Sequence, residues 1–405
     1  MLSFQQALDI VKEKLTAGDL RLRTEVVPLG GAQGRVLAED VAADRDYPPF
    51  HRSIRDGYAV RSVDVTPLPV DLHRRGEIRA GEHYTGVVGR GECVSIMTGA
   101  PLPAGADAVV MVEYTEAQGG KIRIQRAVSS GENVVQQGSE VLKGARVLSR
   151  GGRLGAAELG LLATVGKSQV PVYVQPGVAI LPTGDEVVPV EQPPEWFQIR
   201  NSNAIALAAQ VAAAGGIPRC LEIAPDAPES LRRLIEEGLK CDLLLLSGGV
   251  SAGKYDFVEQ VLADLGAEFF FQSVALRPGK PLVFGRVAGK FFFGLPGNPV
   301  STFVTFALFA RPALAVLQGA DFRQPGFLRA RLGKPLQERT GLTVFLPTRL
   351  DRSSGEPVAF PLDWKGSGDL VGLAAADGFI VMHPDQTTLL AGDWVDVMPK
   401  WDFGF

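Results

Sequence analysis

The feature that most constrains the fold of this chain is a regular alternation of apolar runs and amphipathic segments over residues 173–319. Runs such as GVAILP and DLLLLS have the length and composition of buried strands. Segments with helical spacing follow them, for example SNAIALAAQVAAAGG, where Ser202 is the predicted N-cap and Gly215 and Gly216 the stop. This alternation predicts a mostly parallel sheet with helices on both faces.

Three of the predicted strands end in polar turns that contain glycine. The turns are Thr183-Gly184-Asp185-Glu186, Ser247-Gly248-Gly249-Val250-Ser251 and Gly294-Leu295-Pro296-Gly297-Asn298-Pro299-Val300-Ser301. One such turn needs no ligand to explain it, because tight turns require glycine anyway. Three at the carboxyl edge of one sheet predict a polyanion pocket, since glycine bares N–H groups and lets a ligand approach the backbone.

The second turn also resembles part of a phosphate-binding loop. From Gly248 the spacing is G-x-x-x-x-G-K, which ends at Gly253 and Lys254. A hydrolase loop continues with Ser or Thr, which binds Mg²⁺, but this chain has Tyr255 and then the carboxylate of Asp256. The sequence therefore favours a device in which acids from several strands hold the cation.

Three acidic residues are predicted at this sheet edge, namely Glu186, Asp226 and Asp256. Carboxylates that face a phosphate site repel it unless a cation lies between them, so the sequence predicts a Mg²⁺ site. Asp226 could equally begin a helix, and Asp256 could complement a helix dipole. Glu186 has no such structural explanation.

Two cations, Arg277 and Lys280, flank a Pro-Gly bend in RPGKP. Solvation at the surface is the ordinary state of such residues, but their place between two strands at the same edge favours oxyanion binding. The four histidines, His51, His73, His83 and His383, are scattered, and no catalytic role is predicted for them.

Composition excludes several classes of partner. The net charge is −4 and there is no long basic run, so nucleic acid is not expected as a partner. Cys93, Cys220 and Cys241 fit no zinc or redox spacing and predict reduced thiols in a cytoplasmic protein.

No membrane association is expected either. The N-terminus is predicted as a capped helix with Ser3 and Gln6 in a capping box, and not as a signal peptide. The most apolar late stretch, 300–317, is interrupted by Arg311 and Pro312. It predicts a buried, kinked helix.

The pattern of predicted helices and strands changes along the chain and indicates four domains. The predicted fold class is multidomain α/β plus β. The predicted domains are a discontinuous helical domain (1–46 and 141–172), an inserted β-rich domain (47–140), an α/β domain (173–319) and a C-terminal β domain (320–405). In the inserted domain, EYTEAQGGKIRIQRAV predicts a hairpin that turns at Gly119 and Gly120.

An ordered set of motifs over nearly the whole chain resembles the molybdopterin molybdenumtransferase family, which includes bacterial MoeA and the E domain of gephyrin. The motifs are SIRDGYAV, IMTGAPLPAGADAVVMVE, GENVVQQGSEVLKG, LPTGDEVV, RNSNAIAL, SGGVSAGKYDF, RPGKP, GLPGNPVS and KGSG. The resemblance implies a central three-layer α/β domain and a C-terminal domain similar to a β-barrel. It implies that molybdate is inserted into adenylylated molybdopterin, that AMP leaves and that Mg²⁺ is required.

The resemblance also implies partners. These are adenylylated molybdopterin, molybdate, a second copy in a homodimer, and recipient molybdoenzymes or the adenylyltransferase of the same pathway. The ligand cleft would lie between the α/β domain of one subunit and the inserted domain of the other, which would explain anion-binding turns in two modules.

Carried over by position, the family's functional residues fall on two sets. The catalytic set is Asp56, Thr98, Glu140, Glu186, Asp226 and Asp256, of which the last three would bind the metal. The ligand-binding set is Gly99, Ser247, Gly248, Gly249, Ser251, Arg277, Lys280, Pro296, Gly297, Asn298, Ser301 and Ser367.

The chain departs from the family pattern at several positions. Glu140 replaces a shorter aspartate, and His51 and Arg52 replace Asp-Asn. Ser273 and Pro347 stand where the family frequently has Lys and Arg, so Arg277, Lys280 and Ser367 would carry more of the molybdate contact.

Three alternative functions remain at this stage. An adenylyltransferase or nucleotide pyrophosphatase could use the same α/β module, and a cofactor carrier or scaffold would bind without chemistry. A P-loop NTPase is the third, and Tyr255 argues against it. The residues alone lead to a Mg²⁺-assisted, phosphate-binding α/β enzyme. Molybdenum and pterin come from the resemblance.

Overall fold

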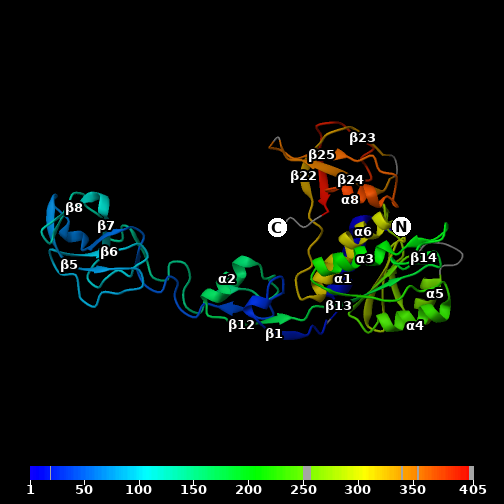
Figure 1. Ribbon diagram of the computed structural model, residues 1–405, viewed down its shortest axis with the longest axis horizontal. Coiled ribbons are helices and arrows are strands. Elements are labelled where there is room, and N and C mark those ends of the chain that lie inside the picture. Colours follow the sequence, from blue (N-terminus) through cyan, green and yellow to red (C-terminus); the bar gives the residue numbers. More distant parts are fainter. Residues whose placement is uncertain (19, 250–256, 339–340, 354, 401–405) are drawn as a thin grey trace. The chain divides into compact units, whose positions relative to one another are not determined.

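The computed structural model describes the chain except residues 19, 250–256, 339–340, 354 and 401–405. It divides into two compact units, which are described separately (Figure 1). Unit 1 comprises Met1–Val26, Gly34–Ala38 and Pro171–Phe405, and unit 2 comprises Val27–Gln33 and Glu39–Val170. The predicted site residues Ser251 and Asp256 lie outside the described residues.

The predicted α/β sheet is the centre of unit 1. Its strands, in spatial order, are β16 (Ile217–Cys220), β13 (Gly177–Pro182), β17 (Leu243–Ser247), β21 (Lys290–Leu295), β20 (Val283–Val287) and β18 (Glu268–Phe271). The first four are mutually parallel, while β20 runs antiparallel to β21 and β18 antiparallel to β20. The prediction of a mostly parallel sheet is confirmed.

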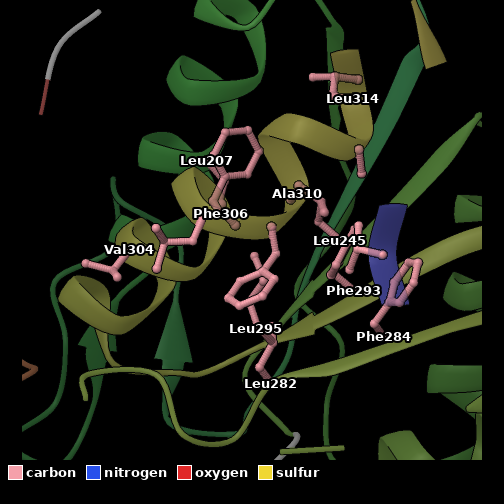
Figure 2. Close-up of a cluster of buried hydrophobic side chains, with 14 of the residues drawn as sticks. Leu207, Leu245, Leu282, Phe284, Phe293, Leu295, Val304, Phe306, Ala310 and Leu314 are labelled. Carbon is pink, nitrogen blue, oxygen red and sulfur yellow. The ribbon is translucent and has the colours of Figure 1, made fainter. Parts of the chain in front are cut away.

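Helices cover both faces of this sheet. One core cluster joins the sheet to α1 (Phe4–Thr16), α3 (Ser202–Ala213), α6 (Pro299–Thr305) and α7 (Arg311–Leu317), and the other joins it to α4 (Pro228–Gly238) and α5 (Phe257–Asp264). In β17, Leu243 and Leu245 belong to the first cluster and Leu244 and Leu246 to the second, as strand alternation requires. Figure 2 shows part of the first cluster, with Phe293 of the sheet among the side chains of the covering helices.

The first helix belongs to this core. α1 has the predicted capping box, in which the Gln6 N–H donates to Ser3 Oγ at 3.2 Å and the Ser3 N–H donates to Gln6 Oε1 at 2.9 Å. Its buried face packs with the α/β sheet, although the sequence predicts 1–46 as part of a separate helical domain. The expectation that 1–46 is mainly helical is wrong for its second half, where β1 (Thr24–Pro28) and β2 (Val41–Ala42) follow.

The long apolar helix of 299–317 is buried in unit 1. Among the described residues it is the one helix long and apolar enough to cross a membrane, and most of it is enclosed by the protein, as in a core helix. The predicted break at Pro312 takes the form of a π-helical turn, η4 (Phe306–Ala310), directly before α7. A wider turn gives the proline ring room against the preceding carbonyls, which an unbroken α-helix lacks.

The C-terminal part of unit 1 is a closed five-stranded barrel. Its strands are β24 (Thr343–Asp351), β25 (Val358–Pro361), β22 (Leu328–Leu332), β28 (Trp394–Pro399) and β26 (Gly378–Met382), and β26 pairs again with β24. A short helix, α8 (Leu370–Ala375), accompanies the barrel. The two-residue strand β19 (Leu276–Arg277) pairs in parallel with β24, which ties Arg277 to the barrel.

Unit 2 contains a six-stranded sheet and one α-helix, α2 (Ala156–Thr164). The strands, in spatial order, are β7 (Ala108–Met111), β4 (Gly57–Val60), β6 (Glu92–Ile96), β5 (Val70–Ile78), β9 (Lys121–Ile124) and β8 (Thr115–Gln118). The predicted hairpin is β8–β9, and Gly119 and Gly120 both have positive φ, as its two-residue turn requires.

The remaining strands are short. They form the pairs β2 with β11 (Arg146–Leu148), β3 (Arg52–Ser53) with β10 (Val134–Val135), β14 (Val187–Val188) with β15 (Ile199–Arg200), and β23 (Leu336–Gln337) with β27 (Thr388–Leu389). β1 and β12 (Gln169–Tyr173) each cross the sequence boundary between the two units. The boundaries of the four predicted domains stay a prediction.

Candidate active site

A cavity of about 840 Å³ lies at the carboxyl ends of β13, β17 and β21. This volume suits a ligand of nucleotide size. Ten predicted site residues line it: Glu186, Ser247, Gly248, Arg277, Lys280, Pro296, Gly297, Asn298, Ser301 and Ser367. All belong to unit 1, so one compact unit brings together residues that are up to 181 positions apart in the sequence, from Glu186 to Ser367 (367 − 186).

The turn after β13 contributes Thr183 and Glu186. Thr183 is only 3% exposed, and its hydroxyl Oγ1 is buried without a hydrogen-bond partner although the residue lines the cavity. Buried polar atoms are normally paired, so this hydroxyl is an exception at the wall of the cavity. Glu186 is exposed and also lines the cavity.

The turn after β17 depends on two glycines. Gly248 and Gly249 have φ of +95° and +64°, where a side chain is strained. A Cβ on Gly249 would lie 2.7 Å from Val258 Cγ2 and 2.8 Å from Thr183 Oγ1, so this position is closed to other residues. Gly249 itself is not among the cavity-lining residues, and its role is to let the chain pass over Thr183.

The turn after β21 is held by side-chain hydrogen bonds. Asn298 Nδ2 donates to Ser367 Oγ at 2.9 Å, and the Val300 N–H donates to the Ser367 carbonyl at 3.0 Å. Ser367 lies in the C-terminal part of the chain, close to α8. These bonds fix the KGSG segment against the start of α6, as a shared wall of the cavity.

Asn203 and Arg200 line the cavity but were not predicted as site residues. Asn203 Nδ2 donates to Ser247 Oγ at 3.0 Å and to the Gly297 carbonyl at 2.7 Å, so it joins the second turn to the third. The sequence feature that could have identified both residues is the polar run RNSN directly before an apolar helix. The predicted N-cap was wrong by one residue: Asn201 is the cap, and its Oδ1 accepts from the Ala204 N–H at 3.1 Å.

The two predicted cations, Arg277 and Lys280, both line the cavity. Arg277 Nη2 forms an ion pair with Glu338 Oε1 at 2.6 Å, and Arg277 Nε is buried without a partner. Ser273 and Pro347 do not line the cavity, and Pro347 is buried in β24 opposite Phe379.

Acidic side chains gather beside the cavity at the edge of β13. The Asp226 N–H donates to Asp185 Oδ1 at 3.0 Å. Burial, and then the negative charges of Asp185 and Glu186, raise the pKa of Asp226 above its usual value. Asp226 does not cap α4, whose N-cap is Ala227, so the helix-start interpretation of Asp226 is wrong. Like charges held this close favour a cation between them.

The predicted Mg²⁺ ligands are only partly represented in this cluster. Glu186 and Asp226 are close enough to influence each other, whereas Asp256 lies outside the described residues. Within the described part of the chain, no three His, Cys, Asp or Glu side chains are grouped as a metal site. The carboxylate oxygens of Glu186 and Asp226, and the repulsion that Asp226 experiences from Asp185 and Glu186, fit a hard divalent cation.

The other predicted catalytic residues belong to unit 2. Asp56 Oδ1 accepts from the Thr98 N–H at 2.7 Å and from Thr98 Oγ1 at 2.9 Å. These two bonds lower the pKa of Asp56 below its usual value. Gly99 follows with φ of +85°, and Glu140 Oε1 pairs with Arg52 Nη2 at 3.2 Å.

The fold and the cavity define a class: an α/β protein with a cavity at the carboxyl edge of its sheet that is lined by glycine turns and cationic side chains, with acidic residues beside it. Family models match three successive regions. They are the MoeA N-terminal region (domain I and II) at residues 2–166, a probable molybdopterin binding domain at 179–316 and the MoeA C-terminal region (domain IV) at 329–400.

Individual relatives agree with these models. The molybdopterin molybdenumtransferase of Nostoc sp. is 35% identical over 98% of this chain and 94% of its own length, and that of Bacillus subtilis is 36% identical over 93% and 89%. The molybdopterin biosynthesis MoeA protein of Pyrococcus horikoshii OT3 has a TM-score of 0.84 at 30% identity, covering 98% of this chain and all of that chain. The chain belongs to the molybdopterin molybdenumtransferase family, a transferase family of molybdenum cofactor biosynthesis.

Proposed function

We propose that this protein transfers molybdate to molybdopterin, that the molybdopterin arrives adenylylated, and that AMP is released in a Mg²⁺-dependent reaction in the cytoplasm. The observation that carries the proposal is the cavity at the carboxyl ends of β13, β17 and β21. It combines glycine turns with three cationic side chains, Arg200, Arg277 and Lys280. A phosphorylated ligand and an oxyanion both require such a lining.

The chain's own residues hold the phosphate part of the substrate. Asn203 braces the second turn against the third through Ser247 and Gly297, so that the cavity wall is formed before a ligand arrives. A wall that is already in place binds a charged group without first having to reorganise.

Glu186, Asp226 and Asp256 are the proposed Mg²⁺ ligands. Bound there, Mg²⁺ would neutralise the pyrophosphate of the substrate and the leaving AMP. Glu186 presents its carboxylate to the cavity, while Asp185 holds the backbone of Asp226 in place. The raised pKa of Asp226 supports this role, because burial and the charges of Asp185 and Glu186 disfavour its ionised form and a bound cation would offset them.

We place no covalent enzyme intermediate on the path. Water or a molybdate oxygen attacks the AMP phosphorus, and the bond from this phosphorus to the bridging oxygen breaks. The bridging oxygen stays on the pterin phosphate, and the attacking oxygen leaves in AMP. A nucleophilic side chain would need a base within hydrogen-bond reach. Ser247 Oγ and Ser367 Oγ instead accept from the amides of Asn203 and Asn298. Radiolabelled AMP or pterin trapped on the protein would contradict this.

A homodimer is part of the proposal, since the family resemblance assigns Asp56, Thr98 and Glu140 to the same reaction as the cavity. Those residues lie in unit 2, and the cavity lies in unit 1. Mixing two inactive variants, Asp56→Ala and Glu186→Ala, tests this. Recovered activity in the mixture supports sites shared between copies, whereas an inactive mixture argues that each copy acts alone.

The test of the function is release of AMP from adenylylated molybdopterin with Mg²⁺, over a titration of molybdate. We expect release that depends on molybdate and is lost in Glu186→Ala and Asp256→Ala. Tight binding of the substrate without release would favour the carrier alternative. Consumption of ATP without molybdate would favour an adenylyltransferase or pyrophosphatase.

A further inference from the structure

Three cationic side chains line the cavity among the described residues, and one of them is neutralised. Arg277 forms an ion pair at 2.6 Å with Glu338, whereas Arg200 and Lys280 have no acidic partner among the described residues. Arg200 instead donates from Nε to the Val190 carbonyl at 3.0 Å. Glu338 is 23% exposed and is not among the residues that line the cavity.

The pair is held by backbone on both sides. Arg277 ends β19, which pairs with β24 through Leu276 and Thr343. Glu338 follows β23, and its N–H donates to the Thr387 carbonyl at 3.0 Å. Because backbone hydrogen bonds hold both segments, the two side chains start from fixed positions that face each other, unlike most ion pairs between long surface side chains.

The ion pair with Glu338 occupies only one of the two guanidinium nitrogens on one edge of Arg277. Glu338 takes Nη2, while Arg277 Nε is buried and has no partner. Nε–H and one Nη2–H point to the same edge of a guanidinium, the edge that an oxyanion grips with two parallel hydrogen bonds. A buried donor without a partner carries a free-energy penalty. Nε has almost no exposed surface in this arrangement, so a ligand oxygen can remove the penalty only after the Arg277–Glu338 contact has opened. To use both donors, the ligand must displace Glu338 from Nη2.

We propose that Glu338 is a displaceable internal counter-ion. It occupies Arg277 Nη2 when the cavity lacks an oxyanion, and it yields this nitrogen when the oxyanion binds. Its negative charge then lies close to the bound anion and weakens its binding. Glu338 therefore sets the affinity of the Arg277 subsite. This inference rests on the proposed function, in that it takes molybdate to be the oxyanion bound at Arg277.

The inference is tested by isothermal titration of sodium molybdate into the full-length protein at constant ionic strength. Glu338→Gln keeps the shape and a hydrogen-bonding group but removes the charge, and we expect it to bind molybdate about tenfold more tightly than wild type. Glu338→Ala, which also removes the hydrogen bond, is expected to change in the same direction. The matched control is Glu356→Gln, because Glu356 pairs with Arg331 at 3.1 Å and does not line the cavity.

A steady-state readout accompanies the titration. Loss of a competing counter-ion lowers the KM for molybdate, whereas loss of a merely structural contact would lower thermal stability and raise KM. Circular dichroism melts of each variant confirm that it is folded before it is titrated.

The outcomes are distinct. Unchanged or weaker molybdate binding by Glu338→Gln, with weaker binding by Arg277→Ala, would overturn the counter-ion role and leave the oxyanion site in place. Equal binding by wild type and Arg277→Ala would remove Arg277 from the site, and with it this inference. Tighter binding in both Glu338 variants, with Glu356→Gln unchanged, supports it.

Discussion

Asp226 and Asp56 are both predicted catalytic aspartates, but their surroundings differ in kind. Asp226 lies beside Asp185 and Glu186, and burial together with these charges raises its pKa. Asp56 accepts two hydrogen bonds from Thr98, which lower its pKa. The first carboxylate is destabilised in its ionised form, and the second is already satisfied by its own turn.

The contrast separates two ways of building a site. Among the described residues, three groups around the cavity are not satisfied: the carboxylate of Asp226, whose pKa is raised, the hydroxyl of Thr183 and Nε of Arg277. The Asp56–Thr98 turn of unit 2 is complete without a ligand. We infer that the α/β edge supplies the binding energy for cation and anion, and that the Asp56 turn presents a carboxylate in a fixed position.

The largest effect is expected for Glu186→Gln, which keeps the side chain's shape and removes its charge. If the α/β edge organises Mg²⁺, AMP release should fall by about a hundredfold or more. Glu191→Gln is the matched control, because Glu191 is exposed and does not line the cavity. Rates measured at saturating molybdate decide the matter, and equal rates for the two variants would contradict the prediction.

Replacing one glycine in each region compares how much stability each turn loses when it must accommodate a side chain. Gly249→Ala meets both a positive φ and close atoms, and it should destabilise its region by about 3 kcal/mol. Gly99→Ala meets a φ of +85° but no atom within 4 Å, and about 1 kcal/mol is expected. Hydrogen exchange of the peptides around each turn measures the two effects separately. A larger loss at Gly99 would reverse the comparison.

The pH dependence of stability should have opposite signs at the two aspartates. The pKa of Asp226 in the folded protein lies above the ordinary value of 3.8, so the native state binds more protons than the unfolded chain between 3.8 and the raised pKa. Ionised Asp226 therefore destabilises the fold above that pKa, and the penalty disappears as the pH falls. The pKa of Asp56 lies below 3.8, so its stabilisation is present above 3.8 and lost as the pH falls through the folded pKa.

Thermal melts in metal-free buffer from pH 3 upward can detect this. Asp226→Asn should be more stable than wild type near neutral pH, with the difference vanishing in acid. Asp56→Asn should be less stable than wild type near neutral pH, and this difference should also narrow in acid. If both variants shift Tm in the same direction near neutral pH, the expected difference between Asp226 and Asp56 is wrong.

The smallest effect is expected at the Arg52–Glu140 pair. Its side chains are 40% and 59% exposed, and ion pairs of this kind add little to stability. Arg52→Gln should therefore change Tm by no more than about 1 °C. A clear loss of Tm would show that this pair is structural, and would weaken the case for Glu140 as a functional residue.

Much of the α/β region could be predicted from the sequence because its signals are local. The leucine run of β17, the glycine turns and the capping box at Ser3 each specify their own structure within a few residues. The parallel sheet then follows from alternation, and the cavity follows from the rule that the carboxyl ends of parallel strands share an edge.

What escaped prediction depends on distant parts of the chain. Glu338 finds Arg277 across 61 residues (338 − 277) through the pairing of β19 with the barrel. Asn203 joins two turns that are 50 residues apart (297 − 247), and no spacing rule could assign its partners. Asn201 and not Ser202 is the N-cap of α3. Both residue types can cap a helix, and the backbone conformation that decides between adjacent positions cannot be read from composition.

The most direct test of the account follows the Asp226 and Asp56 carboxyl groups by NMR titration, with and without Mg²⁺ in the presence of pyrophosphate. We expect Mg²⁺ to bring the raised pKa of Asp226 down and to leave the pKa of Asp56 unchanged. An Asp226 pKa that does not respond to Mg²⁺, or equal responses at both aspartates, would contradict the claim that the α/β edge binds the cation.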